Sequence, residues 1–324
     1  MSGRSEKEVK SHEKMQLKLK ELPSVFSDFY YYMYSNKSYT TIENYIMYVK
    51  EFAIFICDGE ITSNFYKKVK PADVNRFFAQ MRNIEKNGTY HRVSDSIRAT
   101  KWSALNTFFN YLEKNDLIKN SPMSKTERPR VQDNPEVAFL TEEEMHAIMN
   151  NVKEKANKRM MSRDLALISL GLTTGLRVSA LVQINIEDID FENQTIRVIE
   201  KRGKTCNILF GNNVKENLLT WIEDRKKYFP KIDTDALFVS NYNERMTRDG
   251  VRVILKKYSA GITNKNVTPH VMRHSCATNL YEKTGDIYLC ATVLNHQNVA
   301  TTQRYAEISQ SKKRSAANVL DGLI

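Results

Sequence analysis

The hydrophobic and polar positions in the first third of the chain repeat with the period of an α-helix. Apolar side chains recur every three or four residues in four stretches, which is the spacing of amphipathic helices. The second stretch opens with Thr40-x-x-Glu43, a sequence typical of a helix capping box. Pro71 suits the first turn of the third stretch, and Ser94 suits the cap of the fourth. Four such helices without convincing strands predict a small helical bundle over residues 23–123.

Two segments of different composition border this bundle. Residues 1–22 are rich in Lys, Glu and Ser and carry apolar side chains only late, so we expect a frayed or short helical extension. Residues 124–138 hold two prolines and mixed charge without periodicity, which predicts a linker. The chain is therefore predicted to have two domains, with the linker between them.

Beyond the linker, helical spacing gives way for a short distance to strict alternation. A Thr141-x-x-Glu144 capping box opens the second domain. Apolar and polar residues then alternate in three short runs, at 189–191, 195–199 and 205–210. Such runs predict a three-stranded antiparallel sheet, and helical spacing returns after them. The predicted fold is mainly α with a small antiparallel β-sheet, in which an α+β domain over residues 139–308 follows the bundle.

Charge and cysteine content narrow the class of protein. The 324 residues include 49 Lys and Arg against 38 Asp and Glu, a formal net charge of +11. A strongly basic protein usually meets a polyanion such as nucleic acid. No apolar run approaches the roughly 18 residues that span a membrane, and the N-terminus has no signal-peptide pattern. The cysteines have neither zinc-site nor disulfide spacing, so a reduced, cytoplasmic protein without membrane contact is expected; they are Cys57, Cys206, Cys276 and Cys290.

Two arginines stand in sequence settings that suit the binding of an anion. His270 and Arg273 lie at i and i+3, so they share one face if this run is helical, as its apolar positions indicate. Gly175 can supply the positive φ that ends one apolar helix and starts another. Arg177 is then expected in the first turn of the second helix, whose amides also attract anions. Two guanidinium groups can hold the non-bridging oxygens of one phosphodiester and stabilise its more negative transition state.

Three motifs around these residues resemble the catalytic signature of the tyrosine recombinases, the phage-integrase and Xer-type family. TTGLRVSAL resembles the family's TG-L-R-x-S-E-L box, PHVMRH its H-x-L-R-H box and LNHQNVATTQRY its LGH…TT…Y box. The resemblance implies a catalytic set of Arg177, Lys201, His270, Arg273, His296 and Tyr305, in which Tyr305 is the nucleophile. Lys201 is the first Lys of a K-x-x-K hairpin pattern, and Lys204 is the alternative. No metal or cofactor is implied, because a phosphotyrosyl link preserves the energy of the phosphodiester.

The same resemblance implies how the protein meets DNA. The bundle is similar to the family's SAM-like core-binding domain and residues 139–308 to its catalytic domain, which together grip double-stranded DNA with inverted core sites. A dimer is expected on each site and a tetramer in the synapse. The tail, residues 309–324, is expected to dock either on a neighbouring subunit or on its own. The candidate DNA contacts, each of which is alternatively a helix cap or a solvated side chain, are Thr40, Thr41, Asn44, Tyr48, Arg98, Lys101, Arg202 and Lys204.

Three departures from the family pattern bear on the biological role. Ala180 stands where the family usually has Glu, Asn295 replaces the Gly of LGH, and Gln297 replaces a small or acidic residue. They favour the recombinase of a mobile element over an Xer-type enzyme that resolves chromosome or plasmid dimers. A topoisomerase-like or telomere-resolvase-like enzyme and a non-catalytic DNA-binding relative are further alternatives. The sequence therefore predicts a site-specific recombinase that cleaves and rejoins DNA through a 3′-phosphotyrosyl intermediate, for integration or excision of a mobile element.

Overall fold

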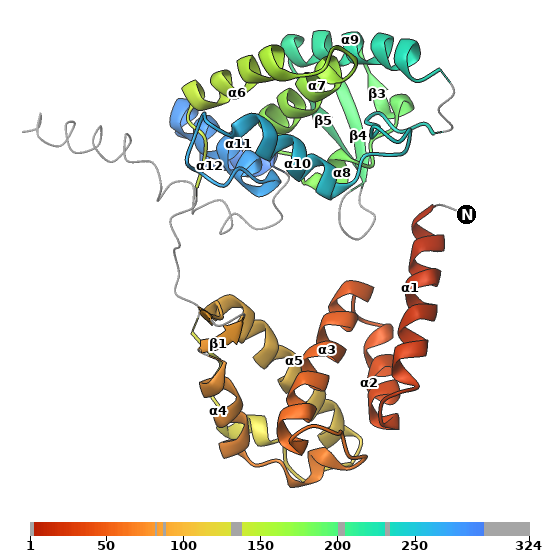
Figure 1. Ribbon diagram of the computed structural model, residues 1–324, viewed down its shortest axis with the longest axis vertical. Coiled ribbons are helices and arrows are strands. Elements are labelled where there is room, and N and C mark those ends of the chain that lie inside the picture. The colour runs from red at the N-terminus through yellow and green to blue at the C-terminus, as the bar shows by residue number, and fades with distance from the viewer. Residues whose placement is uncertain are drawn as a thin grey trace, which may run out of the picture. The chain divides into compact units, whose positions relative to one another are not determined.

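The computed structural model describes residues 3–81, 83–86, 89–130, 138–199, 205–230 and 234–294. The chain divides into two compact units, Met1–Asp133 and Asn134–Ile324 (Figure 1). The division lies inside the segment 124–138, for which the sequence predicts a linker. Trp102 Nε1 donates a hydrogen bond to Thr126 Oγ1 at 3.2 Å. The first residues of that segment therefore belong to the first unit.

The first unit is a bundle of helices around an aromatic core. Its helices are α1 (Gly3–Leu19), α2 (Ser24–Tyr34), α3 (Tyr39–Cys57), α4 (Pro71–Gln80) and α5 (Asp95–Lys114), with 3-10 turns at Phe65–Lys68 and Pro122–Lys125. Phe26 of α2, Phe52 of α3 and Phe108 of α5 are fully buried. Phe65 stacks on Phe108 with ring centroids 6.0 Å apart. The predicted bundle is therefore present, and large aromatic side chains hold its helices together.

The N-termini of these helices agree with the sequence in two cases and differ in one. Pro71 is the first residue of α4, and the Ser94 side chain caps α5, as predicted. The cap predicted at Thr40 is wrong. Helix α3 has Ser38 as its N-cap, and the Ser38 hydroxyl accepts a hydrogen bond from the backbone amide of Thr41 at 3.4 Å. Both residue types can cap a helix, and the earlier one takes the position, which leaves Thr40 inside the first turn.

Two further features of this unit differ from the prediction. A hairpin of β1 (Asn83–Lys86) and β2 (Thr89–Arg92) connects α4 to α5, although the sequence predicts no strand there. These strands are too short for alternation to be visible against the helical pattern. The N-terminal extension forms the long helix α1, whose Met15 and Leu19 are buried in the bundle core. Met15 and Leu19 stand at i and i+4 and so share one face of the helix, and Tyr39 of α3 also donates a hydrogen bond to the carbonyl of Ser11.

The second unit combines helices with the predicted sheet. Its elements are α6 (Glu142–Lys155), α7 (Lys158–Thr174), α8 (Val178–Leu181), a 3-10 turn at Ile186–Asp188, β3 (Ile189–Asp190), β4 (Thr195–Ile199), β5 (Thr205–Leu209), α9 (Asn212–Tyr228), α10 (Arg248–Ser259), α11 (Pro269–Thr284) and α12 (Ile287–Val293). The strands pair antiparallel in the order β3-β4-β5. Ile196, Val198 and Ile208 of this sheet are buried in the core. The fold class is the predicted one, mainly α with a small antiparallel sheet.

Helix α7 is the central helix of the second unit. It packs against α6, α9 and α11 (Figure 1), and its residues Ala166, Leu167 and Leu170 are fully buried. A helix covered on several sides holds its ends in fixed positions, and the C-terminal end of α7 leads into the segment that carries Arg177. In the part of the chain that the structure describes, no helix is both long and apolar enough to cross a membrane.

The start of the second unit is bonded to helix α11. The backbone amide of Leu140 donates to Ser275 Oγ at 2.7 Å, and Asn279 Nδ2 donates to Leu140 O at 2.9 Å. Just after it, Thr141 and Glu144 form the predicted capping box of α6, with both reciprocal hydrogen bonds present. The chain that enters this unit is therefore fixed to the helix that carries two of the predicted catalytic residues.

Candidate active site

Arg177 lies where the chain turns from one helix into another. Helix α7 ends at Gly175, whose φ of 58° is left-handed, as the glycine pattern predicts. Arg177 is the N-cap of α8, and its backbone carbonyl accepts hydrogen bonds from the amides of Ala180 and Leu181 at 2.8 and 3.0 Å. The sequence expectation of a place inside the first turn is thus one residue off. Helix α8 is only four residues long. The left-handed turn at Gly175 therefore determines where Arg177 lies.

Gly175 lies against the side chains of Leu294 and Cys276, so a Cβ at this position would require the Leu294 side chain to move. A Cβ at this position would lie 2.5 Å from Leu294 Cδ2 and 3.2 Å from Cys276 Sγ. Burial raises the pKa of the Cys276 thiol to about 12, although Arg273 opposes the rise. The thiol is therefore neutral at physiological pH, and it does not cancel the positive charge of the arginine beside it.

Arg273 of α11 connects the C-terminal ends of two other helices. It lies in α11 with 7% of its surface exposed. Its Nη1 donates to Gly175 O at 2.6 Å, and its Nη2 donates to Leu294 O at 2.8 Å. Gly175 caps the end of α7 and Leu294 caps the end of α12. The two arginine motifs, in which the bonded residues Gly175 and Arg273 are 98 positions apart, therefore lie side by side.

His270 lies one turn before Arg273 on the same helix. Thr268 caps α11 by accepting a hydrogen bond from the amide of Val271, and Pro269 is the first helical residue. The i, i+3 relation that the sequence predicts is therefore present. His270 is exposed whereas Arg273 is buried, so the histidine lies at the solvent end of a face whose deeper part holds the arginine.

The remaining predicted catalytic residues, Lys201, His296 and Tyr305, lie outside the described residues, as do the predicted DNA contacts Arg202 and Lys204. The described residues end close to Lys201 on both sides, at Ile199 and Thr205, and close to His296, at Leu294. Ile199 of β4 pairs with Thr205 of β5, so the two strands flank the segment that contains Lys201. Leu294, which accepts a hydrogen bond from Arg273, stands two positions before His296.

Four of the predicted DNA contacts share one side of α3. Thr40 is exposed, and Thr41, Asn44 and Tyr48 are half-buried. The opposite side of this helix, which includes Ile46, is buried in the bundle core. Polar side chains on a bundle's outer face suit contacts to a sugar-phosphate backbone, and these four residues remain candidates for such contacts.

The two basic candidates on α5 already have acidic partners. Lys101 is 7% exposed, and its Nζ donates to both carboxylate oxygens of Glu51 at 2.6 and 2.7 Å. Arg98 Nη1 donates to Asp95 Oδ1 at 3.0 Å. Lys101 thus joins α5 to α3, a structural role that its sequence pattern does not reveal. Its contact with DNA stays a prediction.

A row of basic side chains on α10 is absent from the sequence-based candidates. Arg248, Arg252 and Lys256 stand at i, i+4 and i+8 and are all exposed. The opposite side of the helix is buried, with Tyr258 fully enclosed. The i, i+4 spacing that marks a helical face is visible in the sequence and identifies this row once the helix is recognised.

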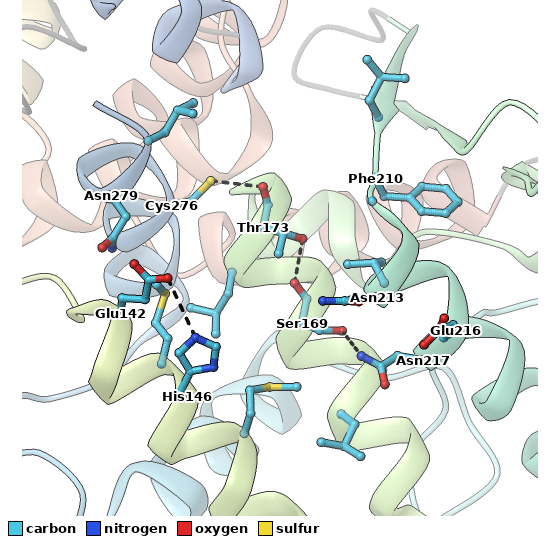
Figure 2. A pocket seen from close by; sticks show the side chains of 18 of the residues that line it. Glu142, His146, Ser169, Thr173, Phe210, Asn213, Glu216, Asn217, Cys276 and Asn279 are labelled. Atoms are coloured by element: carbon cyan, nitrogen blue, oxygen red, sulfur yellow. Dashed lines mark hydrogen bonds and ion pairs between the residues drawn. The ribbon is translucent and has the colours of Figure 1, made fainter. Parts of the chain in front are cut away.

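A groove of about 820 Å³ lies between α6, α7, α9 and α11 (Figure 2). Polar groups of its wall are bonded to one another. Cys276 Sγ donates to Thr173 O at 3.4 Å, and Asn217 Nδ2 donates to Ser169 Oγ at 3.2 Å. Val293, near the end of the described chain, also lines the groove. The groove is therefore adjacent to the helix that carries Arg273 and to the point where the C-terminal segment begins.

Comparison with known proteins identifies the family. The phage integrase family matches residues 138–312, more than half of the 324 residues. The chain belongs to the phage integrase family. This tyrosine recombinase is 28% identical over 278 residues to tyrosine recombinase XerC of Leptospira interrogans, with 86% of each chain covered. It is 29% identical over 276 residues to tyrosine recombinase XerD of Oceanobacillus iheyensis, which covers 84% of this chain and 86% of the relative.

Solved structures share the fold of this recombinase. The XerH site-specific recombinase bound to a palindromic difH substrate superposes with a TM-score of 0.70 at 20% identity, over 88% of this chain and 81% of that one. The Tn1549 transposon integrase in complex with a circular intermediate DNA gives a TM-score of 0.65 at 20% identity, over 88% and 95% of the two chains. The resemblance inferred from the three motifs is confirmed: the protein is a DNA breaking and rejoining recombinase with the recombinase fold.

Proposed function

We propose that this recombinase integrates or excises a mobile element by exchanging DNA strands at inverted core sites, with Arg177, Lys201, His270, Arg273, His296 and Tyr305 as its catalytic residues. The hydrogen bond from Arg273 to Gly175 carries the proposal, because it joins the two arginine motifs in one place. Two guanidinium groups held this way suit the two non-bridging oxygens of a single phosphodiester.

In the proposed cleavage step, the Tyr305 oxygen attacks phosphorus and forms a 3′-phosphotyrosyl bond while the bond to the 5′-oxygen breaks. Lys201 donates a proton to the departing 5′-oxygen, and His270 accepts the Tyr305 proton or orients the phosphate. Arg177, Arg273 and His296 stabilise the negative charge of the pentacoordinate phosphorus. Attack by a 5′-hydroxyl of the partner strand reverses the step and completes the exchange without a metal or an energy source.

Contacts with duplex DNA are proposed for both units. In the first unit they involve the outer face of α3, with Thr40, Thr41, Asn44 and Tyr48, and the basic side chains of α5. In the second they involve the hairpin residues Arg202 and Lys204. The exposed row on α10 adds a third basic surface. Because the substrate is DNA and the four cysteines are free thiols, we infer that the enzyme works in the cytoplasm.

We also propose that the enzyme binds as a dimer on each core site and as a tetramer in the synapse. The tail, residues 309–324, ends with the apolar residues Val319, Leu320, Leu323 and Ile324. The groove between α6, α7, α9 and α11 is a suitable acceptor for this tail from a neighbouring copy, since Met145, Leu165 and Leu280 give it apolar walls.

Xer-type resolution of chromosome or plasmid dimers is the second candidate role. Its support is the similarity to proteins named XerC and XerD over more than four-fifths of their length. The departure at Ala180 favours the mobile-element role: the alanine is 5% exposed inside α8, where the family pattern has a carboxylate. Inverted repeats beside the gene, at the ends of a mobile segment, support the first role, and sites on a chromosome or plasmid away from any mobile segment support the second.

A nicked suicide substrate that carries the cognate site tests the proposed chemistry. The wild-type protein is expected to form a covalent protein–DNA adduct and to exchange strands between two sites, and Tyr305→Phe is expected to form none. Arg177→Ala should bind duplex with nearly unchanged affinity while adduct formation falls by about 10²- to 10³-fold. Equal losses of duplex affinity and of cleavage would instead mean that Arg177 only binds the sugar-phosphate backbone of the DNA.

A further inference from the structure

Arg245 donates hydrogen bonds to the segment that follows Arg177. Its Nη1 donates to Val182 O at 3.1 Å and to Ile184 O at 3.3 Å, and its Nη2 donates to Asn185 Oδ1 at 2.6 Å. The side chain is half-buried. Burial lowers the pKa of Arg245, while Asp235 and Asp188 oppose that change. A guanidinium that is partly removed from water needs hydrogen-bond acceptors, and these three oxygens supply them.

The segment that Arg245 holds has little stability of its own. Helix α8 has only four residues, Val178–Leu181, and Val182 caps its C-terminal end. A single helical turn is unstable in water, because few hydrogen bonds compensate for the ordered backbone. The last carbonyls of a helix also lack partners within it. The bond from Arg245 to the Val182 carbonyl supplies such a partner and ties the turn to the rest of the unit.

The backbone around Arg245 forms a rigid support for this bond. Arg245 is bridged to Val239 in antiparallel fashion, and Asn185 is bridged to Ala236. The amide of Leu237 donates to Ile184 O at 2.8 Å. Residues 236–239 are fully buried. The backbone of Arg245 is therefore held by residues 236–239. The same residues also pair with the segment 184–185, to which the Arg245 side chain is bonded.

The opposite end of the same stretch is held in a similar way. Arg273 Nη1 donates to Gly175 O at 2.6 Å, two positions before Arg177. Arg245 donates to Val182 O, five positions after Arg177. Arg177 therefore lies on a short piece of chain whose two ends are each bonded to the guanidinium of another arginine.

We infer that Arg245 is a positioning residue for Arg177: its bonds to Val182, Ile184 and Asn185 hold the one-turn helix α8 so that the Arg177 guanidinium meets the scissile phosphate. Arg245 lies before Thr247, the N-cap of α10, and needs no contact with DNA for this role. The inference rests on the proposed function of Arg177. Small displacements of a group that binds the reacting phosphate cost large factors in rate.

The test compares Arg245→Met with the wild-type recombinase on the nicked suicide substrate at saturating protein. The variant is expected to form the covalent adduct about 10- to 100-fold more slowly, with duplex affinity within about threefold of wild type. A second substrate carries a neutral methylphosphonate at the scissile position, where no charge has to be neutralised. On it the defect of Arg245→Met is expected to shrink to less than about threefold, and the same is expected for the defect of Arg177→Ala.

Arg225→Met is the matched control. Arg225 is also a buried arginine that donates to a backbone carbonyl, Thr234 O at 2.6 Å, but it lies on α9 and this bond does not go to the segment 178–185 that follows Arg177. This variant is expected to lower the melting temperature and to leave the rate of adduct formation unchanged at a temperature where it is folded. If Arg245→Met does not fold, Arg245→Lys carries the test, because a lysine keeps the charge but cannot reach all three acceptors.

The possible outcomes distinguish the positioning role of Arg245 from the catalytic role of Arg177. A defect of Arg245→Met that is equally large on both substrates, or no defect at all, overturns the positioning role. A normal rate for Arg177→Ala on the phosphodiester instead overturns the proposed function of Arg177. Failure of the inference and failure of the proposed function therefore give different results.

Discussion

Gly175 meets two requirements at once, a left-handed backbone and the absence of a Cβ. Its φ is 58°, which costs an L-residue about 1 kcal/mol. The atoms nearest to an added Cβ would belong to Leu294 and Cys276, beside the two helices that complete the site. The conformation at this residue and the packing around it are therefore coupled, and both determine where Arg177 lies.

Gly175→Ala is expected to lower the free energy of unfolding by about 2–4 kcal/mol, because backbone strain adds to overpacking. Gly261→Ala is the control, since Gly261 has a φ of 79° with no atom near the added Cβ. It is expected to lose only about 1 kcal/mol. Denaturant unfolding of the two variants measures both values, and equal losses would mean that Leu294 and Cys276 yield without cost.

At the scale of the element, the start of α6 is bonded to the chain that precedes α11. Glu144 accepts hydrogen bonds from Thr263 Oγ1 at 2.7 Å and from Lys265 Nζ at 2.6 Å, besides the amide of Thr141. Burial raises the pKa of Glu144, but these hydrogen bonds outweigh it and lower the pKa below the ordinary value. One carboxylate thus fixes both a helix start and the chain that leads into α11.

Glu144→Gln is expected to reduce the free energy of unfolding at pH 7 by about 1–2 kcal/mol. Because the folded pKa is depressed, the contribution of Glu144 is present above its unfolded value of 4.5 and is lost as pH falls through the folded value. The difference between wild type and variant should therefore shrink in acid. Unfolding at pH 7 and at about pH 3.5 measures it.

Glu143→Gln is the control for this prediction. Glu143 stands in the same first turn and interacts equally with the helix dipole, but it is exposed and bonds to neither Thr263 nor Lys265. A smaller loss of stability is expected for it. If the stability difference between wild type and Glu144→Gln stays constant with pH, ionisation of Glu144 does not contribute to stability.

At the scale of the whole molecule, the formal net charge is +11. Some of the basic side chains form ion pairs with acidic residues, and others are exposed on the surface. Lys101 of α5 pairs with Glu51 of α3, and Arg98 pairs with Asp95 on its own helix. The three basic side chains of the row on α10 are exposed, and of these Arg252 pairs with the exposed Asp249 at 2.6 Å. Affinity for a duplex depends on displayed charge, because each neutralised phosphate releases counterions.

Arg248→Gln and Lys256→Gln are each expected to weaken duplex binding and to make the slope of log K against log salt shallower by about 0.9. Lys226→Gln, which removes the same charge from the exposed last turn of α9, should leave the slope unchanged. Binding titrations over a range of salt concentrations measure the slopes. Equal changes for all three variants would indicate a general charge effect rather than a contact surface on α10.

The sequence by itself determined the helical bundle, the three-stranded sheet, most helix starts and the family, because periodicity, capping and the arginine motifs are local. It did not determine the hairpin β1–β2, the cap at Ser38 or the packing of α1, where local signals are short or compete. Only the tertiary structure decided that Lys101 belongs to Glu51, that Arg273 bonds to the turn before Arg177, and that Arg245 holds the turn after it. Those contacts join residues from about 50 to about 100 positions apart, and no local pattern encodes which distant carbonyl or carboxylate a buried cation will meet.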